Sequence, residues 1–157
     1  MTHFGIICPA ATGHFNTMFP LARELQKRGH RVTLVGVLDA QPKTLAAGLE
    51  FRVIAESECP PGTTAQSFAH SVPLTGLAAL RYTIGLFQES TALLLRDAPR
   101  AIKEAGVEAL LVDQTTSPGG TVAEYLSIPF ITVCSSLVLN QDDSIPPFFT
   151  HWSYNPT

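Results

Sequence analysis

The feature that most constrains this chain is its alternation of short apolar runs with longer segments of helical period. The run at residues 31–38 (RVTLVGVL) is β-branched and apolar enough for a strand buried on both faces. The other strand-length runs lie at residues 4–8, 51–55, 108–112 and 129–134. Strands alternating with helices predict the α/β class: a Rossmann-like parallel sheet with helices on both faces.

The segments between the runs carry helix signals. After the first run, apolar residues recur at positions 15, 18, 19, 22 and 25 and the pattern stops at Gly29, so we expect a helix capped by Asn16 or Thr17, with Pro20 in or near its first turn. Further helices are expected near residues 44–47, at 117–126 and at 74–105, where Pro99 predicts a division into two. Residues 57–73 lack a sustained period and predict a surface loop.

Composition excludes several classes of function. The chain has 157 residues, 45% of them hydrophobic, which is enough for one domain with its own core. The formal net charge of -3 gives no broad positive field, so no nucleic-acid partner is expected. No apolar run approaches the roughly 20 residues of a membrane span, and the start lacks the basic region of a secretory signal. We therefore expect a cytoplasmic protein without a transmembrane segment.

Two polar residues follow strand-like runs at points where side chains can do chemistry. His14 comes shortly after the first run, and Asp113 closes the fourth. The carboxyl ends of parallel strands share one edge of a sheet, so these two side chains can meet. A histidine oriented by a carboxylate is a general base, because the carboxylate fixes the tautomer and stabilises the imidazolium as it forms. The alternative is that both residues merely cap or pack helices, which would allow them to lie out of reach of each other.

Other candidate sites are weaker. The turn at residues 10–13 lacks the glycine spacing and lysine of a nucleotide-binding loop, and no cofactor-binding residue is assigned. Gly119-Gly120 fits either an anion at a helix start or close helix-to-sheet packing. The remaining histidines are dispersed, so no metal is expected. Three distant cysteines fit neither a disulfide framework nor zinc, and we expect them to be structural.

The order of several short motifs carries a family resemblance. Residues 8–16 (CPAATGHFN) are followed by LAREL at 21–25 and RGHRVT at 28–33, and LVDQ at 111–114 is followed by PGG and AEYLSIP. This combination resembles the amino-terminal region of UDP-sugar-dependent glycosyltransferases with the two-domain GT-B fold. Residues 113–147 are most similar to bacterial zeaxanthin and macrolide-type glucosyltransferases. One departure is Thr17, since relatives often carry proline directly after the asparagine of the Gly-His motif.

The resemblance implies a role for the chain and for both polar residues. Residues 1–157 would be a truncated amino-terminal, acceptor-binding domain, inactive without the carboxyl-terminal domain that holds the nucleotide sugar. His14 would deprotonate an acceptor hydroxyl that attacks the sugar of a UDP-sugar, such as UDP-glucose, with inversion, while Asp113 bonds the far imidazole nitrogen. The missing domain would neutralise the leaving UDP. No metal or other cofactor is implied.

Apolar residues from the irregular parts of the chain are candidate walls for a lipophilic, carotenoid-like or macrolide-like acceptor, although each fits an ordinary core position as well. They are Phe15, Phe68, Phe87, Leu137, Phe148 and Phe149. Two other hypotheses about function remain open from the residues alone. One is a noncatalytic α/β binding module, and the other is a small flavodoxin-like domain that binds a nucleotide near Gly119-Gly120.

Overall fold

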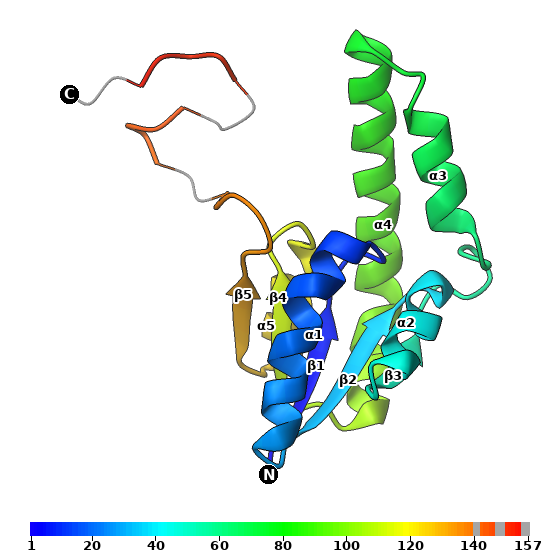
Figure 1. Cartoon of the computed structure of the whole chain (residues 1–157), viewed down its shortest axis with the longest axis vertical. Coiled ribbons are helices and arrows are strands. Elements are labelled where there is room, and N and C mark those ends of the chain that lie inside the picture. Colours follow the sequence, from blue (N-terminus) through cyan, green and yellow to red (C-terminus); the bar gives the residue numbers. More distant parts are fainter. Residues whose placement is uncertain (140–141, 147–149, 155–157) are drawn as a thin grey trace.

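The computed structural model describes residues 1–139, 142–146 and 150–154, and its centre is a parallel five-stranded sheet (Figure 1). The strands lie side by side in the order β3-β2-β1-β4-β5. In chain order they are β1 (His3–Ile7), β2 (Arg31–Gly36), β3 (Glu50–Val53), β4 (Ala109–Asp113) and β5 (Phe130–Val133). The predicted Rossmann-like α/β fold is confirmed.

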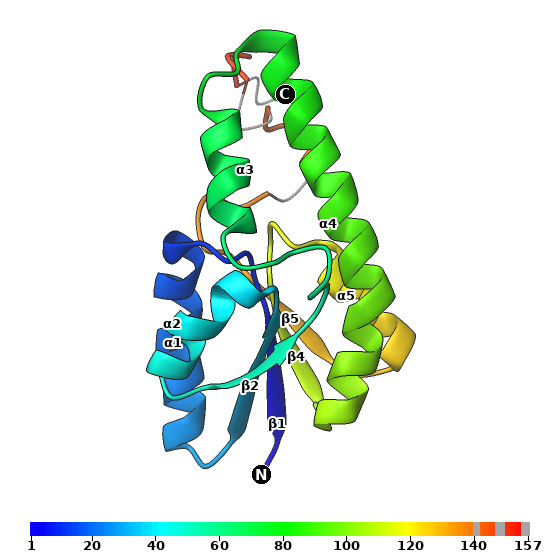
Figure 2. The same ribbon diagram turned by 90° about the vertical axis from the view of Figure 1, so that its right-hand side faces the viewer.

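Helices cover both faces of the sheet (Figure 2). The helices α1 (Thr12–Lys27) and α2 (Gln41–Ala46), with the short 3₁₀ helix η1 (Leu38–Ala40), lie on one face. On the other face, α5 (Pro118–Leu126) packs beside the lower part of α4 (Gly76–Ala105). The helix α3 (Thr63–Ser71) runs alongside the upper part of α4.

Neighbouring residues of the three central strands, β2, β1 and β4, contribute to two separate core clusters, as the pleat of a strand dictates. Ile6 joins the cluster under α1, together with Phe15, Met18 and Ala22, whereas Ile7 joins the cluster under α4 and α5. Leu34 and Val35 divide between the two clusters in the same way. The central strands are therefore apolar at consecutive positions because both of their faces are covered.

Helix α1 begins earlier than its sequence signals predict. Its N-cap position is Ala11, which makes no side-chain capping bond, and Pro20 lies inside the helix. The expectation of a cap at Asn16 or Thr17 is wrong, because burial of one helical face against the sheet decides where α1 starts. Pro20 is exposed, on the side away from that buried face. As a result, His14 lies in the first turn of α1 and not in a preceding loop.

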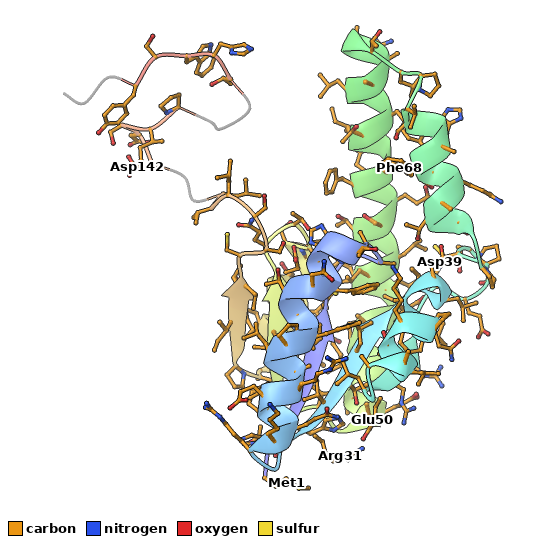
Figure 3. The ribbon with its side chains drawn as sticks, in the orientation of Figure 1. Met1, Arg31, Asp39, Glu50, Phe68 and Asp142 are labelled. Atoms are coloured by element: carbon orange, nitrogen blue, oxygen red, sulfur yellow. The ribbon has the colours of Figure 1, made fainter. Side chains whose placement is uncertain are left out.

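Helix α3 occupies part of the segment that was expected to be a loop. Its amino-terminal N–H groups bond to Asp39 of η1: Gly62 N lies 2.6 Å from Oδ1, and Thr64 N lies 2.7 Å from Oδ2. Figure 3 labels Asp39 beside the start of α3. Burial raises the pKa of Asp39, but these hydrogen bonds outweigh burial and hold the pKa below its usual value. The cap comes from a distant part of the chain, so no local pattern announces it.

Helix α4 is one continuous helix of 30 residues, and the expected division at Pro99 is wrong. Leu94, Ala98 and Ile102 share one helical face and are buried against the sheet, and they hold the helix together on both sides of the proline. The upper half of α4, with α3, projects beyond the carboxyl edge of the sheet (Figure 2). In the part of the chain that the structure describes, no helix has both the length and the apolar character that crossing a bilayer requires.

Helix α5 approaches the sheet closely because it carries two adjacent glycines. A Cβ at Gly119 would lie 2.6 Å from Val112 Cγ1, and one at Gly120 would lie 3.1 Å from the Phe130 ring. A distance of 2.6 Å is shorter than Cβ atoms make with neighbouring atoms in protein structures, so a side chain at Gly119 would force the helix or the strand to move. Close packing therefore accounts for the Gly119-Gly120 pair without a bound anion.

We predict that Gly119→Ala lowers the free energy of unfolding by about 1–3 kcal/mol, because the added methyl group overpacks the contact with Val112. Gly85→Ala is the matched control, since nothing lies within 4 Å of a Cβ at Gly85 in α4. In a helix interior that change should raise stability by about 0.5–1 kcal/mol. Urea unfolding of both variants measures the two effects, and equal stabilities would contradict the packing account.

Candidate active site

His14 and Asp113 meet at the carboxyl edge of the sheet. Strands β1 and β4 are parallel neighbours, with Ile7 opposite Val112, so the residues that follow them emerge side by side. His14 Nδ1 lies 2.7 Å from Asp113 Oδ2. The Asp113 side chain is completely buried, whereas the His14 side chain is 24% exposed. The pair is therefore within hydrogen-bonding reach, which the noncatalytic alternative did not require.

The turn after β4 holds the Asp113 carboxylate in place. Thr115 donates to Oδ1 twice, from its backbone N at 2.9 Å and from Oγ1 at 2.7 Å. Burial raises the pKa of Asp113, but the hydrogen bonds from His14, Thr115 and Ser135 outweigh burial and keep the pKa below its usual value. Asp113 is thus an ionised acceptor at neutral pH, fixed on one oxygen by Thr115 and on the other by His14.

This arrangement selects one tautomer of His14. An ionised carboxylate only accepts hydrogen bonds, so the proton on the imidazole lies on Nδ1 and points at Asp113. The Nε2 lone pair is then available as a base, and no described residue forms a hydrogen bond with Nε2. A hydroxyl group placed at Nε2 could lose its proton there, and Asp113 would stabilise the resulting imidazolium.

The sequence interpretation missed a third member of this cluster, Ser135. Its Oγ lies 3.0 Å from His14 Nδ1. Ser135 follows β5, which pairs with β4, so three neighbouring strands deliver His14, Asp113 and Ser135 to the same edge. The signal that could have found Ser135 is the one used for the other two: a polar residue just beyond the carboxyl end of a strand.

The apolar residues proposed as acceptor walls occupy different surroundings. Phe15 lies on the buried face of α1 and stacks on Phe19 with ring centroids 4.8 Å apart, which is the setting of a core residue. Phe68 on α3, Phe87 on α4 and Leu137 after β5 are exposed. Phe148 and Phe149 lie outside the described residues. The exposed members are thus free to contact a ligand, whereas Phe15 is a core residue.

The cysteines next to this edge have contrasting environments. Cys8 is buried, and burial, followed by the nearby negative charge of Asp113, raises the pKa of its thiol to about 12. Cys8 therefore stays protonated at neutral pH and is not a nucleophile, as its structural role predicts. Cys134 is exposed and does not share the buried environment of Cys8.

Comparisons with known proteins match this chain to glycosyltransferases. The zeaxanthin glucosyltransferase of Pantoea ananas is 32% identical over 146 residues, and that of Pseudescherichia vulneris is 30% identical over the same length. Each alignment covers 93% of this chain and 34% of the relative, so the chain spans about a third of the length of these proteins. No protein-family model matches the chain.

Solved glycosyltransferase structures share the fold. The glycotransferase of kitacinnamycin superposes with a TM-score of 0.68 at 22% identity, over 88% of this chain and 31% of that one. A spinosyn rhamnosyltransferase complexed with thymidine diphosphate superposes with a TM-score of 0.62 at 19% identity, over 94% of this chain and 37% of that one. The resemblance to the amino-terminal part of GT-B glycosyltransferases, predicted from the motifs, is confirmed.

The lowered pKa of Asp113 predicts a loss of stability in acid. Because the folded-state pKa is below the unfolded value of about 3.9, the stabilisation is complete above that pH and disappears as pH falls through the folded-state pKa. Asp113→Asn should therefore unfold at lower urea concentration at pH 7, and its stability should fall less steeply below about pH 4. The exposed Asp143→Asn is the control. If the free energy of unfolding of Asp113→Asn falls in acid as steeply as that of the wild type, Asp113 is not the buried, ionised carboxylate described above.

Proposed function

We propose that this chain is the acceptor-binding and catalytic-base domain of an inverting glycosyltransferase. The enzyme transfers a hexose from a nucleoside-diphosphate sugar to a hydroxyl of a lipophilic acceptor. The observation that carries the proposal is the 2.7 Å contact between His14 Nδ1 and Asp113 Oδ2 at the carboxyl edge of a Rossmann-like sheet. The similarity to two zeaxanthin glucosyltransferases over 93% of the chain supports the class of reaction.

In the proposed reaction His14 acts as the general base. The acceptor hydroxyl oxygen forms a bond with the anomeric carbon while the bond from that carbon to the diphosphate breaks, so the configuration at the carbon is inverted. The hydroxyl proton moves to His14 Nε2, and the negative charge of Asp113 stabilises the imidazolium through Nδ1–H. The nucleoside diphosphate leaves with the electron pair of the broken bond.

The donor is proposed to bind in a part of the enzyme that this chain does not contain. The chain spans 34% of the length of the zeaxanthin glucosyltransferases, and its helix-to-sheet glycines are explained by packing. The motif resemblance suggests UDP-glucose, whereas a structurally similar rhamnosyltransferase was solved with thymidine diphosphate. Both nucleotides therefore belong in the assay.

Among the described residues, no group of three or more His, Cys, Asp or Glu side chains is arranged to hold a metal ion.

The acceptor is proposed to contact an apolar strip on the projecting half of α4. The strip continues the same helical face whose lower residues, Leu94, Ala98 and Ile102, pack on the sheet. It therefore overhangs the carboxyl edge where His14 lies, and Phe68 of α3 lies in the same projection (Figure 3). Each residue of this overhang strip is about half exposed: Leu77, Leu80, Ile84 and Phe87. A surface of this kind fits a lipophilic alcohol.

The first test is His14→Ala in the full-length protein, assayed with UDP-glucose and TDP-glucose against a panel of lipophilic alcohols. Loss of the general base should lower the rate about 10²- to 10⁴-fold with the fold intact. His30→Ala is the control, because His30 lies at the opposite end of α1. Near-normal turnover of His14→Ala would exclude His14 as the base.

The second test is Phe87→Ala. If the ring contacts the acceptor, kcat/KM for a long apolar alcohol should fall about 10-fold or more, from the loss of roughly 1.5–3 kcal/mol of apolar burial. A short alcohol that does not reach the strip should be affected little. Tyr125→Ala, which removes an exposed ring from α5, is the control. Equal losses for long and short acceptors would contradict the overhang strip as an acceptor wall.

A further inference from the structure

We infer that Ser135 is a positioning residue that holds the imidazole of His14 in its base-competent orientation, an inference that rests on the proposed function for its catalytic consequence. Ser135 Oγ lies 3.0 Å from His14 Nδ1, compared with 2.7 Å for Asp113 Oδ2. The imidazole edge that carries Nδ1 thus faces two partners from two neighbouring strands. Nε2 is directed away from both.

The protons available to these three groups allow one consistent arrangement. Nδ1–H points to the nearer and charged partner, Asp113. Ser135 therefore does not donate to Nδ1. The Ser135 hydroxyl donates its proton to the Asp113 carboxylate, and this hydrogen bond helps to lower the pKa of Asp113. The Ser135 oxygen also accepts a weaker, secondary hydrogen bond from His14 Nδ1–H. Ser135 thus bridges both members of the pair.

The contact from Ser135 matters because the hydrogen bonds around Asp113 do not all restrain the imidazole of His14. Thr115 fixes the other carboxylate oxygen of Asp113, whereas the hydrogen bonds of the imidazole among the described residues are those with Asp113 and Ser135. With Asp113 alone, rotation of the ring about its bond to Cβ is limited by one hydrogen bond. A flipped ring would turn Nδ1 toward the cleft and point Nε2 inward, which is the wrong arrangement for proton transfer. A second contact on the Nδ1 edge disfavours that flip.

Ser135 is itself anchored by the residue after Asp113. The Gln114 backbone N donates to Val133 O at 3.0 Å, and its side-chain Nε2 donates to Leu137 O at 2.7 Å. Leu139 N in turn donates to Gln114 Oε1 at 3.3 Å. Gln114 thus clamps the chain on both sides of Ser135 to the end of β4. The position of Ser135 is set by the same turn that positions Asp113.

The test compares Ser135→Ala with Ser135→Thr, which keeps the hydroxyl, and with Ser136→Ala, which removes the neighbouring hydroxyl. In the full-length enzyme, Ser135→Ala should lower kcat about 10-fold with little change in KM, the scale of one lost hydrogen bond. Ser135→Thr should restore most of the rate, and Ser136→Ala should not change it. Thermal unfolding of each variant checks that the fold is retained.

A spectroscopic readout separates this inference from the proposed function. With ¹⁵N-labelled histidine, the His14 nitrogen shifts should report a single Nδ1–H tautomer in the wild type. In Ser135→Ala a fraction of the rings should be flipped, with Nε2 on the side of Asp113, so a fraction of the Nε2–H tautomer should appear. If the tautomer changes but the wild type transfers no sugar, the positioning role stands and the proposed function fails. An unchanged tautomer and rate in Ser135→Ala would overturn the inference, as would a Thr variant as impaired as the Ala variant.

Discussion

The pairing of β1 with β4 is the constraint on which the rest of this structure depends. These strands are far apart in sequence, and their parallel register places Ile7 opposite Val112. One consequence is the core, because both strands contribute consecutive apolar residues to the clusters on the two faces of the sheet. Another is the site, since the chain leaves both strands at the same edge. A shift of one residue in this register would exchange the faces and move His14 away from Asp113.

The strands and the pair of polar residues could be predicted because their signals are local. Strand-length apolar runs mark the five strands, and the positions of His14 and Asp113 after two of them follow from topology alone. The start of α1 could not be predicted, because no capping side chain stands at Ala11 and packing decides the boundary. The same reasoning applies to α4, where buried contacts on either side of Pro99 override a residue that usually ends a helix.

Helix α3 was missed for a different reason. Its cap is Asp39, a residue brought close only by the folded chain, and a local pattern contains no information on such a contact. Ser135 did carry a local signal, because it follows the carboxyl end of a strand as His14 does, but only the folded chain shows its contact with the imidazole. The acceptor candidates divide in the same way: hydrophobicity alone did not separate Phe15, which is buried in the core, from Phe87, which is exposed on the projecting part of α4.

The contrast between Cys8 and Cys134 has a practical consequence. Alkylating reagents attack thiolates that they can reach, and Cys8 offers a buried sulfur that burial keeps protonated. Cys134 is exposed and immediately precedes Ser135. Cys59 is partly buried, and burial with the nearby carboxylates raises the pKa of its thiol. A maleimide fluorophore would therefore attach preferentially at the end of β5, beside the edge that carries His14, without any engineered cysteine.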